Sequence, residues 1–131
     1  MIDHFPHPAG LAPGNGFSHV TSATGRIVAV SGQLPVDASG TLVSHDPLTQ
    51  ARQVFANIGA ALAAVGAVPA DILRLNFYVL DLTDLPVVRT ARDEFVDTAN
   101  PPASSLVQVA GLVLPGARLE IDALVVMSTT D

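Results

Sequence analysis

The chain contains no cysteine and no lysine, and each absence excludes a class of chemistry. Without cysteine there is no disulfide, no thiolate nucleophile and no cysteine-ligated metal site. All six basic residues are arginines, so a Schiff base on a lysine amine is excluded as well. Twelve acidic residues outnumber the arginines and give a formal net charge of −6. This charge argues against a nucleic-acid partner, because general nucleic-acid binding relies on a basic surface.

Long hydrophobic runs are also missing, although 49% of the residues are hydrophobic. No run reaches the roughly 18 apolar residues that a membrane-spanning helix needs, and we see no signal peptide. We therefore expect a cytoplasmic protein with no membrane partner. We expect residues 1–131 to form a single domain, and the high apolar content indicates that part of its surface is buried between subunits.

Motifs for cofactors and metals are absent from the sequence. The glycines near the N-terminus follow no buried strand, so they do not form a nucleotide-binding loop. The histidines in loop-like segments lack metal-ligand spacing to a pair of carboxylates. Ser31-Gly32 also lacks the flanking residues of a nucleophilic serine motif. We expect no cofactor and no metal.

The first half of the chain predicts two strands and a helix. Residues 1–16 are rich in proline and glycine and are expected to form an irregular arm packed on the domain. Short strands are predicted at 17–21 and 26–31. Asp46-Pro47 combines a capping side chain with a proline at the first helical position. Apolar residues spaced by three and four then predict a helix with one buried stripe through residues 48–65.

The second half predicts a strand, a helix and two more strands. The strand covers residues 72–80, and Thr83 or Asp84 caps a helix that stops before Asn100. Two apolar strands joined by a turn at Pro115-Gly116 complete the chain. The order β-β-α-β-α-β-β predicts an α+β fold with both helices on one face of a mixed sheet. The other, apolar face is expected to be covered by oligomerisation.

A lone carboxylate, Glu120, lies early in the last apolar strand. A bare buried carboxylate is costly, so Glu120 must face solvent, a partner or a ligand. Such a group can move a proton in catalysis. The alternative is a structural partner for an arginine across an interface, and we favour the catalytic interpretation.

Five segments together carry a resemblance to a known family. They are residues 16–20, the Ser-Gly-Gln-x-Pro motif within 30–35, residues 50–57, residues 78–84, and residues 101–105 with 119–123. Each segment is weak alone, but their order and spacing resemble the Rid family, also called the YjgF family, over nearly the whole chain. The resemblance implies a chorismate-mutase-like fold. It also implies a homotrimer with a central β-barrel-like core and a ligand cleft at each subunit interface.

The resemblance further implies a reaction and a set of site residues. The best-known members hydrolyse reactive enamines and imines to 2-oxoacids and ammonia. In this parallel Glu120 orients or activates a water, and Ser31 is the second catalytic candidate, a hydroxyl at the end of a strand that can donate to the substrate. The alternative for Ser31 and Gly32 is an ordinary strand-ending turn, and we favour the binding role. Gly32 and the backbone near Pro115 hold the substrate, which is a small-molecule metabolite.

Three positions depart from the family pattern. Ser104 stands where an arginine binds the substrate carboxylate, and a neutral hydroxyl cannot replace a bidentate guanidinium. Phe17 replaces a usual tyrosine, and Arg89 stands where some members have asparagine. The loop 112–117 is also about one residue longer. These changes predict a substrate other than a simple 2-iminoacid, or alternatively a non-catalytic metabolite-binding or regulatory trimer.

The remaining candidates keep two interpretations each. Arg89 or Arg118 would supply the missing cation, with Arg89 favoured, or both are surface arginines. Ser104 and Ser105 bind a polar ligand group, or Ser104 only fills the space of the missing arginine. His19 acts in acid-base chemistry or is a hydrogen-bonded structural residue. A ribonuclease role, known for some relatives, is disfavoured by the acidic charge and the lack of lysine.

Overall fold

The structure is a computed structural model that describes residues 1–129. Within these residues, six strands, two α-helices and two short 3-10 helices follow one another. They are β1 Asp3–Phe5, β2 Val20–Ser22, β3 Arg26–Gln33, α1 Pro47–Ala64, η1 Pro69–Asp71, β4 Ile72–Val79, η2 Leu82–Asp84, α2 Leu85–Phe95, β5 Ala103–Gln108 and β6 Leu119–Met127.

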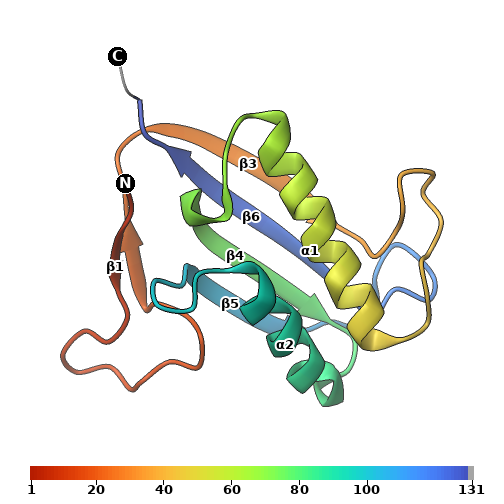
Figure 1. Cartoon of the computed structure of the whole chain (residues 1–131). Coiled ribbons are helices and arrows are strands. Elements are labelled where there is room, and N and C mark those ends of the chain that lie inside the picture. The colour runs from red at the N-terminus through yellow and green to blue at the C-terminus, as the bar shows by residue number, and fades with distance from the viewer. Residues whose placement is uncertain (130–131) are drawn as a thin grey trace.

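The core of the fold is a four-stranded mixed sheet in the order β3-β6-β4-β5. β6 is antiparallel to both of its neighbours, whereas β4 and β5 run parallel. Both α-helices lie on the same side of this sheet (Figure 1). The predicted α+β class, with two helices on one face of a mixed sheet, is therefore confirmed.

The N-terminal part differs from the expectation. The predicted arm contains β1, which pairs with β2 in a separate two-stranded ribbon beside the main sheet (Figure 1). The strand predicted at 17–21 is shorter and begins at Val20. Ser18, just before it, is buried and donates its hydroxyl to the Pro101 carbonyl at 2.6 Å. A three-residue strand among prolines and glycines leaves no periodic signal, because only a long-range partner stabilises it.

Helix α1 begins as the sequence predicts. The Asp46 carboxylate accepts a hydrogen bond from the Thr49 amide at 2.9 Å, and Pro47 is the first helical residue. Its buried stripe, with Val54, Ile58 and other apolar residues, packs in the core between helix and sheet. The helix therefore forms from a local cap and one apolar face.

Helix α2 is shorter than predicted and starts differently. Asp84 stands at its N-cap position, but its side chain makes no capping hydrogen bond because it binds Arg118 instead. The predicted cap at Thr83 or Asp84 is therefore wrong. Asp81 caps the 3-10 helix η2 that precedes α2, and its carboxylate accepts from the Thr83 amide at 2.9 Å. The helix ends at Phe95, ahead of the prolines expected to stop it. Neither α1 nor α2 has both the length and the apolar character needed to cross a membrane.

The last two strands are not neighbours. β4 lies between β5 and β6, so the turn at Pro115-Gly116 is part of a longer loop that bridges two non-adjacent strands. In the β4–β6 register Tyr78 lies opposite Glu120, and in the β4–β5 register Leu75 lies opposite Ser104. Because successive side chains of a strand alternate between its faces, these registers place Ser104 on the helix-covered face and Glu120 on the opposite face. We call that opposite face the open face.

Candidate functional site

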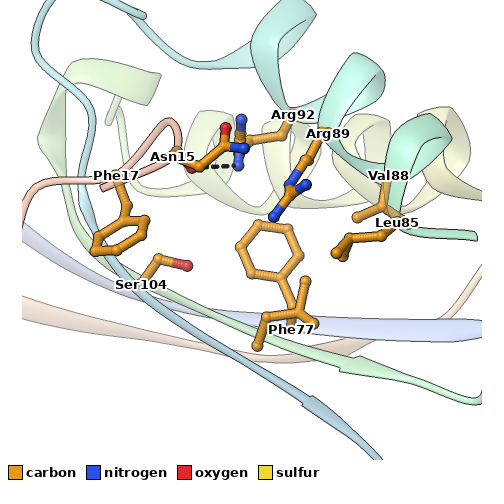
Figure 2. A pocket seen from close by; sticks show the side chains of 9 residues that line it. Asn15, Phe17, Phe77, Leu85, Val88, Arg89, Arg92 and Ser104 are labelled. Atoms are coloured by element: carbon orange, nitrogen blue, oxygen red, sulfur yellow. Dashed lines mark hydrogen bonds between the residues drawn. The ribbon is translucent and has the colours of Figure 1, made fainter. Parts of the chain in front are cut away.

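A cavity of about 310 Å³ lies between α2 and the β4–β5 edge of the sheet (Figure 2). We call it the α2 cavity. Its lining comprises Asn15, Phe17, Phe77, Leu85, Val88, Arg89, Arg92, Ser104 and Leu106. The volume lies at the lower end of the roughly 300–1,000 Å³ of small-molecule sites. Two arginines and no acidic residue line it, in a chain whose net charge is −6.

Each side of the α2 cavity comes from a different element. Ser104 and Leu106 alternate along β5 and face the helices, whereas Ser105 between them faces the open face. Arg89 projects from α2 towards the middle of the cavity, across from Ser104 and above Phe77 (Figure 2). The cavity thus has an arginine on the helix side and a serine hydroxyl on the strand side.

The second arginine, Arg92, holds the N-terminal segment in place. It is buried, its Nη1 donates to the Asn15 carbonyl at 3.1 Å, and its Nε donates to the Asp93 carboxylate at 2.9 Å. The guanidinium passes so close to Gly16 that a Cβ there would overlap it, and Gly16 has a φ of 72°. Only glycine meets both conditions without strain. Arg92 therefore closes one side of the cavity, and its Nε and Nη1 are engaged by Asp93 and Asn15.

Arg118 lies outside the α2 cavity. Its Nε and Nη2 donate to the two carboxylate oxygens of Asp84 at 2.7 and 3.1 Å. Hydrogen bonding to this carboxylate raises the pKa of the Arg118 guanidinium above its ordinary value, and the negative charge of Asp84 adds to the effect. Asp84 is buried at the start of α2, so this bidentate pair joins α2 to the segment before β6. Arg118 is therefore engaged in a structural pair, whereas Arg89 points into the cavity.

Glu120 lies on the open face, next to Gly32 of β3. The β3–β6 register shifts between Val30 and Gln33, which places Gly32 in an irregular part of the strand. A Cβ at Gly32 would overlap the Glu120 carboxylate, so the carboxylate rests directly on the glycine backbone. The ion pairs among residues 1–129 do not include Glu120. A half-buried carboxylate on a glycine, with Ser31 beside it, is a group that can accept a proton from water.

A row of polar side chains crosses the open face beside Glu120. Asp122 accepts hydrogen bonds from the Asn76 amide at 2.8 Å and from the Tyr78 hydroxyl at 2.9 Å. Arg74 donates to the Asn76 side-chain oxygen at 2.9 Å and to the Ser105 hydroxyl at 2.6 Å. Ser105 is therefore part of this row and does not line the α2 cavity.

Tyr78 is the only tyrosine of the chain, and its ionisation reports on this row. The hydrogen bond to Asp122 raises the pKa of Tyr78 above its ordinary value of 10.0, and burial and the charges of Asp122 and Glu120 raise it further. We expect the near-ultraviolet absorbance of tyrosinate to appear at higher pH than in free tyrosine. Because folding favours the neutral phenol, its contribution to stability is complete below about pH 10 and is lost as the pH rises through the folded pKa.

The control for this titration is Asp122→Asn, which removes the charged acceptor. We expect the Tyr78 pKa to fall towards its ordinary value in this variant. An unshifted Tyr78 titration in the unsubstituted protein would contradict the hydrogen-bonded arrangement of the open face.

The structure separates the predicted site residues into two main groups. Phe17, Arg89 and Ser104 come together in the α2 cavity. Glu120, Gly32 and Ser31, with Ser105 in the neighbouring polar row, lie on or beside the open face. One chain therefore holds the proposed base and the cationic cavity on different faces of one sheet.

Two predicted residues lie outside both groups. The His19 ring is hydrogen-bonded through Nε2 to the Ala12 carbonyl. It also packs edge-on against the Phe17 ring, with the two ring centroids 5.2 Å apart. It lines a separate cavity beside Arg74. Pro115 is exposed in the loop between β5 and β6.

Several lining residues were not predicted. Asn15 lies in an aperiodic segment, and its backbone carbonyl accepts from Arg92, so the sequence holds no signal for it. Arg92 follows Arg89 by three positions, a spacing that places both on one helix face and was available from the sequence. Phe77 and Leu106 were expected only as apolar strand residues. Residues 1–129 contain no group of three or more His, Asp or Glu side chains arranged to hold a metal ion.

Comparison with known proteins identifies the family. The family described as Endoribonuclease L-PSP matches residues 8–127. A 2-iminobutanoate/2-iminopropanoate deaminase of Salmonella typhimurium is 36% identical over 104 residues, which cover 78% of this chain and 80% of the relative. The deaminase of the same name from Escherichia coli is 35% identical over 104 residues, with the same coverage.

Solved structures agree with these sequence matches. YyfB from Yersinia pestis, described as a protein of unknown function of the conserved Rid family, is 34% identical with a TM-score of 0.87. The match covers 94% of this chain and 97% of that one. RidA from an Antarctic Psychrobacter is 30% identical with a TM-score of 0.73, and the match covers 95% and 94% of the two chains. From its family match, its relatives and its fold, this chain is a member of the Rid family.

Proposed function

We propose that the protein is a Rid-type deaminase, a hydrolase that converts a reactive imine or enamine metabolite into a carbonyl product and ammonia. The observation that carries this proposal is the Glu120 carboxylate resting on Gly32, unpaired with any arginine within residues 1–129. Relatives about one-third identical over 78% of the chain are named imine deaminases, which supports the same reaction class.

The active unit in this proposal is a homotrimer of single-domain subunits, residues 1–131, in the cytoplasm. The open faces of three sheets pack around a central barrel-like core, in the chorismate-mutase-like arrangement of the family. Ile27 is 72% exposed and Val107 48% exposed on strands of the sheet, so apolar side chains are available for such packing. Each intersubunit cleft then combines the α2 cavity of one subunit with Glu120 and Gly32 of the next.

The chemistry follows from the groups that meet in this cleft. Glu120 takes a proton from a water as the water oxygen adds to the imine carbon and forms a carbinolamine. Glu120 passes this proton to the imine nitrogen, which completes the neutral carbinolamine. The carbinolamine hydroxyl then transfers its own proton through Glu120 to the nitrogen as the carbon–nitrogen bond breaks, so that ammonia leaves and the carbonyl forms. The Ser31 hydroxyl and the backbone at Gly32 and Pro115 hold the substrate. No metal or cofactor takes part, and every atom of the products comes from the imine and water.

Ser104 weakens the binding of a substrate carboxylate at the position of the family arginine. A serine hydroxyl gives a single neutral hydrogen bond where the family arginine gives two charged ones, and charge-assisted hydrogen bonds are about twice as strong. We propose that simple 2-iminoacids such as 2-iminopropanoate are poor substrates for this reason. The Ser104→Arg variant is expected to restore at least about tenfold in kcat/KM for them.

Ammonia release from imines generated in situ by an amino-acid oxidase tests the proposal, with the unsubstituted protein and Ser104→Arg assayed side by side. Faster hydrolysis than in a protein-free control, for any imine of the panel, supports the deaminase. Absence of acceleration in both proteins over a panel of small, branched and aromatic imines would contradict it.

A non-catalytic metabolite-binding or regulatory trimer is the alternative. The observation in its favour is the same Ser104 together with Phe17, two departures in the cavity from the family pattern. Saturable binding of a metabolite without turnover would support it. An RNA substrate is disfavoured by the net charge of −6, and the proposal includes no nucleic-acid partner.

A further inference from the structure

The α2 cavity contains a cationic group without a counter-ion. Arg89 is half-buried and lines the cavity, and no Asp or Glu shares that lining. The ion pairs among residues 1–129 engage Arg52, Arg92 and Arg118, and Arg89 is in none of them. A partly desolvated guanidinium with free donors favours an anionic ligand, since desolvation strengthens its attraction to a negative charge.

The walls around Arg89 are apolar. Phe17, Phe77 and Leu106 line one part of the cavity, and Leu85 and Val88 line another. Ser104 is the one hydroxyl among the lining residues and lies across from Arg89 (Figure 2). A ligand that fills this space therefore needs one small anionic head and an apolar body.

We infer that Arg89 is the carboxylate-binding residue of this protein and that its substrates are 2-imino carboxylates with a bulky apolar substituent. The guanidinium binds the carboxylate from α2, the Ser104 hydroxyl donates a further hydrogen bond, and the substituent lies against Phe17, Phe77 and Leu106. The identification of these molecules as substrates rests on the proposed deaminase function. Their binding by Arg89 does not depend on turnover.

The geometry explains why the arginine on α2 favours larger molecules. With serine at position 104, the strand side of the cavity is open, whereas a long side chain there would occupy it. The cation on the opposite wall leaves the space between helix and strand for the substituent. A small 2-iminoacid bound to Arg89 leaves this apolar space unfilled. Its binding therefore lacks the favourable free energy of burying an apolar substituent against the cavity walls.

Other sources of the cation are excluded by their contacts. The charge of Arg92 is paired with Asp93, and Arg118 is paired with Asp84 outside the cavity lining. Arg89 is therefore the lining arginine that has no paired carboxylate among residues 1–129. A carboxylate also suits the site better than a phosphate dianion, because one unpaired guanidinium balances a single negative charge and would leave the second charge of a dianion uncompensated beside apolar walls.

Binding of 2-oxo acids, which share the carboxylate but cannot be deaminated, tests the inference by calorimetric titration. We expect phenylpyruvate to bind at least about tenfold tighter than pyruvate. We expect Arg89→Gln to weaken binding of phenylpyruvate at least about tenfold and Arg89→Lys to weaken it less. Binding of phenylpyruvamide, which lacks the carboxylate, should be weak and unchanged by either substitution.

The matched control is Arg52→Gln. Arg52 is exposed, its guanidinium lies 2.8 Å from the Glu94 carboxylate, and it does not line the cavity. It should leave binding unchanged, and circular dichroism of each variant establishes that it is folded. Equal binding of pyruvate and phenylpyruvate by the unsubstituted protein would overturn the inference without any variant, as would full phenylpyruvate binding by folded Arg89→Gln.

The two proposals fail separately. Arg89-dependent binding of phenylpyruvate with no ammonia release from any imine contradicts the deaminase and supports the carboxylate site. Ammonia release that depends on Glu120, with Arg89→Gln unchanged in both binding and kcat/KM, contradicts the carboxylate site and supports the deaminase.

Discussion

Replacing Glu120 with glutamine is expected to lower kcat for imine hydrolysis by about 10²–10⁴-fold, the usual contribution of a positioned general base. Glutamine has nearly the same shape and fits over Gly32, but its amide cannot take a proton from water. Because Glu120 lies on the open face and Arg89 in the α2 cavity, binding of phenylpyruvate should change little. The measurement is steady-state ammonia release beside calorimetric titration of the same preparation.

Glu94→Gln is the matched control for this experiment. Glu94 is an exposed carboxylate on α2, and its pair with Arg52 is of the surface type that contributes about 0–1 kcal/mol. It should leave turnover unchanged. A folded Glu120→Gln protein with unchanged kcat would remove Glu120 from the mechanism and leave the deaminase without its base.

The parts of the fold that depend on neighbours in the sequence could be predicted. Asp46 caps α1 as expected because the capping oxygen and the Thr49 amide are three residues apart. Asp84 has a similarly suitable side chain, but a partner distant in the sequence, Arg118, binds its carboxylate. Helix α2 therefore has no side-chain cap, and Asp81 caps only the 3-10 turn before it. Local patterns predict a cap only where no tertiary contact competes for the same oxygen.

In the candidate site, too, the residue types could be predicted from the sequence, whereas their long-range contacts could not. The sequence singled out Glu120 as a lone carboxylate, but Asp122 is a second carboxylate on the same strand and face, and it differs from Glu120 in being hydrogen-bonded to Asn76 and Tyr78. The contact of Glu120 with Gly32 depends on a register shift in β3 that the sequence analysis did not locate. The choice between Arg89 and Arg118 also needed the structure. Both had the right chemistry, and the difference is that Asp84 engages Arg118, whereas Arg89 lines the cavity.

The second large effect is expected at Gln50, a fully buried polar side chain on α1. Its amide nitrogen donates to the carbonyls of Ser44 at 2.8 Å and Gly116 at 2.9 Å, and its oxygen accepts from the Arg118 amide at 2.8 Å. One side chain therefore satisfies three backbone groups in two loops. The second of these loops leads directly into β6 and Glu120.

Gln50→Leu preserves approximate volume and helix propensity but removes all three hydrogen bonds. These three hydrogen bonds are part-buried, and a backbone group that loses its partner there costs about 1–3 kcal/mol, so the free energy of unfolding should fall by about 3 kcal/mol. Urea denaturation at a fixed protein concentration measures this loss, since the proposed trimer would make stability concentration-dependent. The matched control is Gln53→Leu, about one turn further along the same helix. Gln53 is half-buried, and its amide donates only to the Asn57 side chain at 2.8 Å.

The control should lose less than about 1 kcal/mol, because Asn57 keeps its own bonds to the carbonyls of Leu34 and Val36. Equal losses in Gln50→Leu and Gln53→Leu would show that the buried amide does not hold the loops. If the loss at Gln50 is large, the loop before β6 should loosen as well, and kcat should fall although no catalytic group has changed. Helix α1 would then position Glu120 through Gln50, so that the stability of the fold and the placement of the proposed base depend on the same side chain.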